Sequence, residues 1–155
     1  LDLRLKLYTV PGQVQHDSTR KAVLSRADGV VFVADSQVSQ QENNAVAFEN
    51  LTVNLERVGL GIESIPMVIQ FNKRDMAAIL PEDEVVARWG ATPWAPVVMA
   101  SALHGRGVVE TYRLLLQRLY PLLVDEHAVD ARFGLAMSEF VGLLGVDGGV
   151  DHAAV

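Results

Sequence analysis

The stretch MVIQFNKRD, residues 67–75, joins a short apolar run to an abruptly polar turn. A run of this length, rich in β-branched and aromatic side chains, is typical of a strand covered on both faces of a parallel sheet. In open α/β sheets, ligands bind just beyond the carboxyl ends of the strands. The stretch therefore predicts a buried strand at residues 67–71, followed by a candidate binding site.

Similar apolar runs occur at residues 30–34 and 95–100, and leucines alternate with polar residues over residues 1–10. Each of these segments is predicted to form a strand. Helical spacing of apolar residues predicts four helices, at residues 17–27, 42–58, 81–89 and 108–122. This alternation predicts an α/β fold with a mostly parallel sheet built from right-handed βαβ units.

Composition excludes several classes of protein. The chain has 155 residues, 50% of them hydrophobic, no cysteine and a formal net charge of −6. That length suits one soluble globular domain with its own core. Thiolate zinc sites and cysteine nucleophiles are ruled out, and the acidic balance offers nothing to a nucleic acid or an anionic membrane. No run reaches the ~18 apolar residues that a membrane span needs.

The polar turn carries residue types suited to reading a purine base. A carboxylate such as Asp75 can accept two parallel hydrogen bonds from the Watson–Crick edge of guanine, whereas adenine lacks that donor pair. The stem of Lys73 can cover the face of a base, and the amide of Asn72 can tie the loop to neighbouring strands. After the next predicted strand, the N–H of Ala102 can reach the guanine carbonyl oxygen and the hydroxyl of Ser101 can brace the loop. Taken alone, the turn could equally be a solvated charged loop.

A third polar motif, TVPGQ at residues 9–13, follows the first predicted strand. Gly12 allows the backbone to approach a terminal phosphate and donate its N–H. Gln13 can orient the water that attacks that phosphate. Taken alone, this motif could also be an ordinary tight turn.

These motifs, with LYTVPGQ at residues 7–13 and DGVVFVADSQ at residues 28–37, resemble the Ras-like small GTPases. The closer resemblance is to the bacterial gliding-motility and cell-polarity GTPases of the MglA type. It implies a three-layer P-loop NTPase-like (Ras-like) fold, GTP and GDP as ligands, Mg²⁺ as cofactor and GTP hydrolysis in the cytoplasm. At the position of Thr9, most small GTPases have an aspartate that contacts magnesium through a water molecule. The MglA type has threonine at this position.

The resemblance covers about residues 1–123, which we expect to be the C-terminal part of a GTPase domain. The family's phosphate-binding loop, first strand, first switch loop and catalytic arginine would all precede Leu1. In this fold the first strand lies between those expected at residues 1–8 and 30–34, which would otherwise lack a partner. We therefore expect about one further βα unit, a switch loop and a strand upstream. Residues 124–155 are expected to form a weakly specified tail with a helix around residues 135–144.

The resemblance also implies a switch surface at residues 12–26 that binds a roadblock-type activating protein and effectors. Arg20, Lys21 and Arg26 are expected to point outward from the helix in this segment. Three apolar residues of the same helix are expected to face inward: Ala22, Val23 and Ala27. The alternative function is a non-catalytic docking module that has lost its phosphate loop and uses this charged helix face.

Two other α/β classes fit less well. A receiver domain would use Asp35 and Lys73, but it requires proline after the lysine, and Arg74 stands there. A dinucleotide-binding enzyme needs a Gly-x-Gly-x-x-Gly turn, which the sequence lacks. The four histidines show no ligand spacing, and Trp89 and Trp94 are expected to pack around the short helix.

Overall fold

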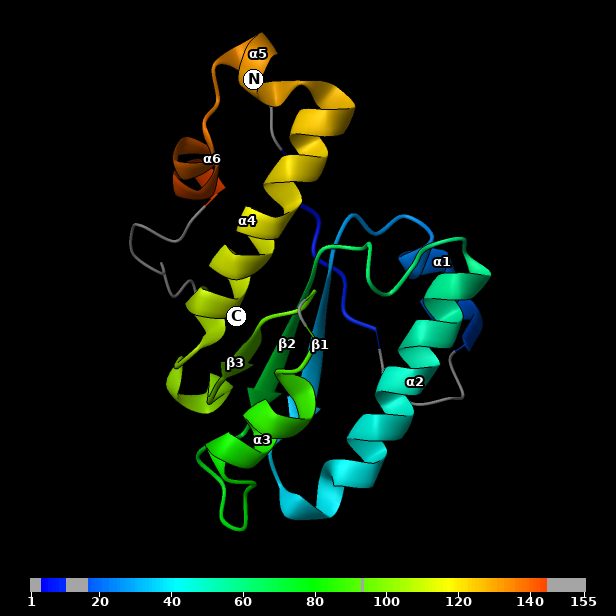
Figure 1. The fold of residues 1–155 in the computed structure, drawn as a ribbon, viewed down its shortest axis with the longest axis vertical. Helices are drawn as coiled ribbons and strands as arrows, with labels where there is room; N and C mark the ends of the chain where they lie inside the picture. The colour runs from blue at the N-terminus through cyan, green and yellow to red at the C-terminus, as the bar shows by residue number, and fades with distance from the viewer. Residues whose placement is uncertain (1–3, 11–16, 93, 145–155) are drawn as a thin grey trace, which may run out of the picture.

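A computed structural model describes residues 4–10, 17–92 and 94–144, which form an α/β fold (Figure 1). Its sheet has three parallel strands in the order β1-β2-β3. In chain order the elements are α1 (Asp17–Leu24), β1 (Val30–Asp35), the 3₁₀ turn η2 (Val38–Gln40), α2 (Gln41–Arg57), β2 (Met67–Asn72), α3 (Glu82–Trp89), β3 (Val97–Met99), the 3₁₀ turn η3 (Ala102–His104), α4 (Val108–His127), α5 (Val129–Phe133) and α6 (Met137–Leu144). The α/β class and the parallel sheet predicted from the sequence are confirmed.

The central strand β2 is buried on both faces, as the apolar run at residues 67–71 predicts. Its alternate side chains enter two separate cores. Met67, Ile69 and Phe71 belong to one core, and Val68 belongs to the other. Figure 1 shows α2 and α4 on opposite sides of the sheet, which gives three layers.

The core between the sheet, α2 and α3 is built around packed aromatic rings. Trp89 stacks on Phe32 with ring centroids 5.9 Å apart. Trp94 stacks on Phe48 at 6.1 Å, and Phe71 meets Trp89 edge to face. Such ring pairs add about 0.5–1.5 kcal/mol each beyond the area they bury. Both tryptophans therefore have the packing role that the sequence predicts.

The helix expected around residues 135–144 is present as α6, and it packs with α5 on α4. Leu135 and Phe140 join the core that holds Val68. The hydroxyls of Tyr120 and Tyr112 donate to the carbonyl oxygens of Leu135 and Leu144 at 2.7 and 2.8 Å. Burial raises the pKa of Tyr112 further above neutral pH, where a phenol is protonated and can donate. Residues 129–144 are thus held to the core by apolar burial and two phenol hydrogen bonds.

The predicted strand at residues 1–10 is not confirmed in its described part, because residues 4–10 have no regular secondary structure. Leu7 is 75% and Tyr8 66% exposed. A strand needs a partner for its backbone groups, and within the described ranges the outer edge of β1 pairs with no strand. The segment with alternating leucines is therefore not part of the sheet in its described residues, 4–10.

The expected orientation of the first helix is wrong at two positions. Arg20, expected to point outward, is only 6% exposed, whereas Ala22, expected to face inward, is exposed. The buried line runs through Arg20 and Leu24, one helical turn apart, where α1 packs against α2. The aliphatic stem of an arginine can cover apolar surface. The prediction for Arg20 was wrong because it considered only the charge of the side chain. Arg26 is exposed as expected, beyond the end of α1 at Leu24.

A buried polar pair fixes α4 to the centre of the sheet. The side-chain N–H of Gln70 donates to the Thr111 hydroxyl oxygen at 2.7 Å, and both residues are buried. The Thr111 hydroxyl donates in turn to the Gly107 carbonyl oxygen at 2.7 Å.

In the described part of the chain, no helix is both long and apolar enough to cross a membrane.

Replacing Thr111 with valine keeps the shape of the side chain but leaves the Gln70 amide buried without its acceptor. The Gly107 carbonyl keeps a partner, because the Thr111 backbone N–H also donates to it. We expect a loss of about 1–3 kcal/mol in the free energy of unfolding, measured by urea denaturation of the full-length protein.

Adding Gln70→Leu to this variant should recover part of that loss, because both polar partners are then gone. Thr52→Val is the matched control, since the Thr52 hydroxyl donates only within α2, to the Phe48 carbonyl. A Thr111→Val protein as stable as the control variant would contradict a stabilising role for the pair.

Candidate functional site

The polar ends of β2 and β3 are joined by two side-chain hydrogen bonds. The Ala102 backbone N–H donates to Asn72 Oδ1 at 2.9 Å. The Ser101 hydroxyl donates to Asp75 Oδ1 at 2.5 Å. Parallel strands end at the same edge of a sheet, which places the two loops side by side. The structure thus brings together four residues that the sequence singles out, and both the tie from Asn72 and the brace from Ser101 are present.

The loop after β3 is shaped by two glycines in left-handed conformations. Ser101 and Arg106 exchange backbone hydrogen bonds of 3.0 Å, which close the loop around η3. Gly105 ends η3 with φ 69°, and Gly107 follows with φ 74°. A Cβ on Gly107 would lie 2.5 Å from the Met99 carbonyl oxygen, so only glycine fits there. This tight return holds Ser101 buried while Ala102 stays exposed.

Asp75 is an exposed carboxylate kept in its charged form. The hydrogen bond from the Ser101 hydroxyl is the main cause that lowers the pKa of Asp75 below its usual range. A hydroxyl donor stabilises the ionised carboxylate over the neutral acid. The site therefore presents a negatively charged acceptor at the end of the sheet, within reach of a ligand in solvent.

Lys73 is paired with a second carboxylate, at the end of β1. Its ammonium lies 2.7 Å from Asp35 Oδ2, with the Lys73 side chain 52% and the Asp35 side chain 18% exposed. Burial tends to raise the pKa of Asp35, but hydrogen bonds from Lys73 and Gln37, with the charge of Lys73, lower it on balance. Lys73 thus links the ends of β1 and β2, just as Asn72 links those of β2 and β3.

One detail differs from the sequence-based picture of the site. The Ala102 N–H was expected to be available to donate to the carbonyl oxygen of guanine. In the structure it donates to Asn72 Oδ1. A ligand oxygen would have to share that donor or displace the amide oxygen. Thr9 lies exposed in the irregular segment 4–10, and Gly12 and Gln13 lie outside the described residues.

Sequence reasoning gave no role at this site to Gln37 and Asn44, and it considered Asp35 only as a receiver-domain residue. The Gln37 backbone N–H donates to Asp35 Oδ1 at 2.9 Å. The Asn44 side chain accepts from the Asp35 N–H at 3.0 Å and donates to its carbonyl at 2.8 Å. The position of Asp35 at the end of its predicted strand is the signal that connects it to the site, because the register places it opposite Asn72.

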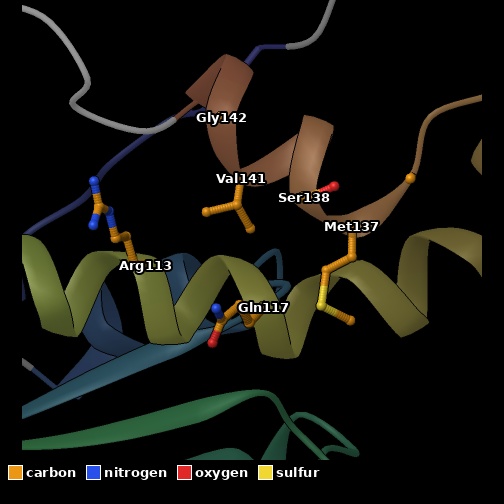
Figure 2. Close-up of a pocket in the computed structure, with 7 residues that line it drawn as sticks. Arg113, Gln117, Met137, Ser138, Val141 and Gly142 are labelled. Atoms are coloured by element: carbon orange, nitrogen blue, oxygen red, sulfur yellow. The ribbon is translucent and has the colours of Figure 1, made fainter.

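A shallow depression between α4 and α6 contains none of these groups (Figure 2). In Figure 2, Met137 and Val141 point from α6 toward α4. The lining mixes apolar and polar side chains: Arg113, Gln117, Ala136, Met137, Ser138, Val141 and Gly142. The polar ends of the strands are therefore the better candidate for function.

The three-layer arrangement, with its polar site at the carboxyl ends of parallel strands, is that of the Ras-like P-loop NTPase fold. The chain is 50% identical over 110 residues to the mutual gliding-motility protein MglA of Myxococcus xanthus (strain DK1622). The aligned segment is 71% of this chain and 56% of MglA, so the chain spans little more than half the length of that relative. No family model matches the chain. This similarity supports an MglA-type Ras-like small GTPase.

Replacing Ser101 with alanine removes the donor that stabilises the Asp75 carboxylate. We expect the pKa of Asp75 to rise toward its ordinary value, measured by an NMR pH titration of the side-chain carboxyl in the full-length protein. The pKa of Asp35 should not change, because Ser101 is not among its partners. Ser25→Ala, which removes an exposed hydroxyl bonded to the Ala22 carbonyl, is the matched control. An unchanged Asp75 titration in Ser101→Ala would show that this bond does not lower the pKa of Asp75.

Proposed function

We propose that this protein is a guanine-nucleotide-binding switch that hydrolyses GTP to GDP. The observation that carries the proposal is the charged, exposed Asp75 carboxylate held by Ser101 beside the Asn72–Ala102 tie. A carboxylate in this position matches the adjacent N–H donors on the edge of guanine, and adenine has no such pair. Lys73 would cover one face of the base with its stem.

The remaining chemistry rests on the family. Gln13 would orient the attacking water and Gly12 would donate to the terminal phosphate. Magnesium supplies charge neutralisation for the phosphates in such enzymes, and Thr9 would reach it through water. Within residues 4–10, 17–92 and 94–144, no three histidine or carboxylate side chains gather as a metal site.

The relative is named a mutual gliding-motility protein, and that name supports a role in motility. We also propose a role in cell polarity and a cytoplasmic location. We further propose that residues 12–26 contact a roadblock-type activating protein and effectors. Because Arg20 is buried, the charged part of this surface would be carried by Lys21 and Arg26. We also propose that residues 1–123 are the C-terminal part of the GTPase domain.

The function is tested by titrating the full-length protein with fluorescent GDP and ADP. We expect GDP to bind and ADP to bind far more weakly, with phosphate released from GTP on incubation. Asp75→Asn should weaken GDP binding about tenfold to a hundredfold, because an amide offers one acceptor where guanine needs two. The same variant should gain affinity for xanthine nucleotides, whose carbonyl replaces the guanine amino group and accepts from the new amide.

Asp83→Asn, an exposed change on α3, is the matched control and should bind GDP normally. GDP affinity unchanged by Asp75→Asn would remove Asp75 from the site. A full-length protein that binds no nucleotide would favour the docking module instead.

A further inference from the structure

Asp35 is a partly buried carboxylate that the proposed mechanism leaves without a role. It ends β1 and lies opposite Asn72 in the sheet register. Oδ2 accepts from the Lys73 ammonium at 2.7 Å. Oδ1 accepts from the Gln37 backbone N–H at 2.9 Å and from its side-chain N–H at 3.2 Å. Both oxygens therefore have fixed partners, and one of these is a residue of the nucleotide site.

Helix α2 and the end of β2 fix the backbone that carries this carboxylate. The amide of Asn44, 6% exposed, both accepts from the Asp35 N–H and donates to its carbonyl. The next backbone N–H, that of Ser36, donates to the Asn72 carbonyl at 2.9 Å. Asp35 is held on either side, so its carboxylate is a rigid anchor for whatever it binds.

The backbone of Lys73 is equally fixed. Its φ of 66° lies in the left-handed region, which a non-glycine residue keeps only where the surrounding structure enforces it. The Arg74 N–H donates to the Ala100 carbonyl, and the Met76 N–H donates to the Lys73 carbonyl, each at 3.0 Å. With its backbone set by the turn and its ammonium by Asp35, the Lys73 side chain is anchored at both ends.

The pairing also keeps two carboxylates in separate roles. Lys73 binds Asp35, whereas Asp75, two residues further along the chain, accepts from Ser101. Without Asp35, the flexible ammonium would be drawn to the next carboxylate, the one that reads the base. Asp35 thus keeps the cation away from the acceptor that a guanine must reach.

We propose that Asp35 is a positioning residue of the nucleotide site: it holds the Lys73 stem in place for the base and leaves Asp75 open to guanine. This inference rests on the proposed guanine-nucleotide function and assigns a residue to it. Asn44 serves the same end by fixing the backbone of Asp35.

Asp35→Asn should weaken fluorescent GDP binding to the full-length protein about threefold to tenfold. Asp35→Glu keeps the charge and should recover most of that loss. In a Lys73→Met background, Asp35→Asn should have no further effect, because Asp35 acts through Lys73. The effect of Asp35→Asn should also shrink at high salt, which weakens the pair in the unaltered protein.

Glu84→Gln is the matched control, since it removes an exposed carboxylate paired with Arg88 on α3 and should leave GDP binding unchanged. Effects of Asp35→Asn and Lys73→Met that simply add, or a Glu variant as weak as the Asn variant, would overturn the inference alone. Normal GDP affinity in Asp35→Asn would do the same. An unaltered protein that binds no guanine nucleotide would overturn both the proposed function and the inference.

Discussion

The hydrogen bond from the Ala102 N–H to the Asn72 side chain is the contact on which the rest of the site depends. It joins the end of the central strand to the end of its neighbour. With that tie in place, Ser101 lies where its hydroxyl donates to Asp75 and lowers the pKa of that carboxyl. The chain need not order these loops when a ligand arrives, and preorganisation of this kind reduces the cost of binding.

A second tie completes the site at the other edge of β2. The ion pair of Lys73 with Asp35 joins the end of β2 to the end of β1. The Asp35 N–H donates to the side chain of Asn44, which connects the end of β1 to α2. The central strand is therefore linked through polar side chains to both neighbours. The buried bond between Gln70 and Thr111 secures α4 in the same sheet. Apolar packing between the sheet and its helices forms the three layers. The polar contacts named above fix the conformations of the loops at the ends of the strands.

Much of the fold could be predicted from the sequence, because β1, β2 and the long helices carry strong local patterns. The four-residue group at the ends of β2 and β3 could also be placed, since parallel strands end at one edge. Three kinds of feature could not. Residues 4–10 are irregular where a strand was predicted, Arg20 is buried by packing against α2, and the short helix α5, which packs on α4, was not predicted. Asp35 and Lys73 could be paired from the sequence only as the residues of a receiver domain, because their ion pair beside the candidate site depends on the register of β1 and β2.

The central claim is that the ends of β2 and β3 are tied together by the Asn72 side chain. Hydrogen exchange at the Ala102 amide of the full-length protein tests this most directly. In Asn72→Ala, we expect the Ala102 N–H to exchange several-fold faster, because its acceptor is gone. The Ala100 N–H, which donates to the Phe71 carbonyl in the sheet, should stay protected. Equal exchange of Ala102 in the two proteins would contradict the account.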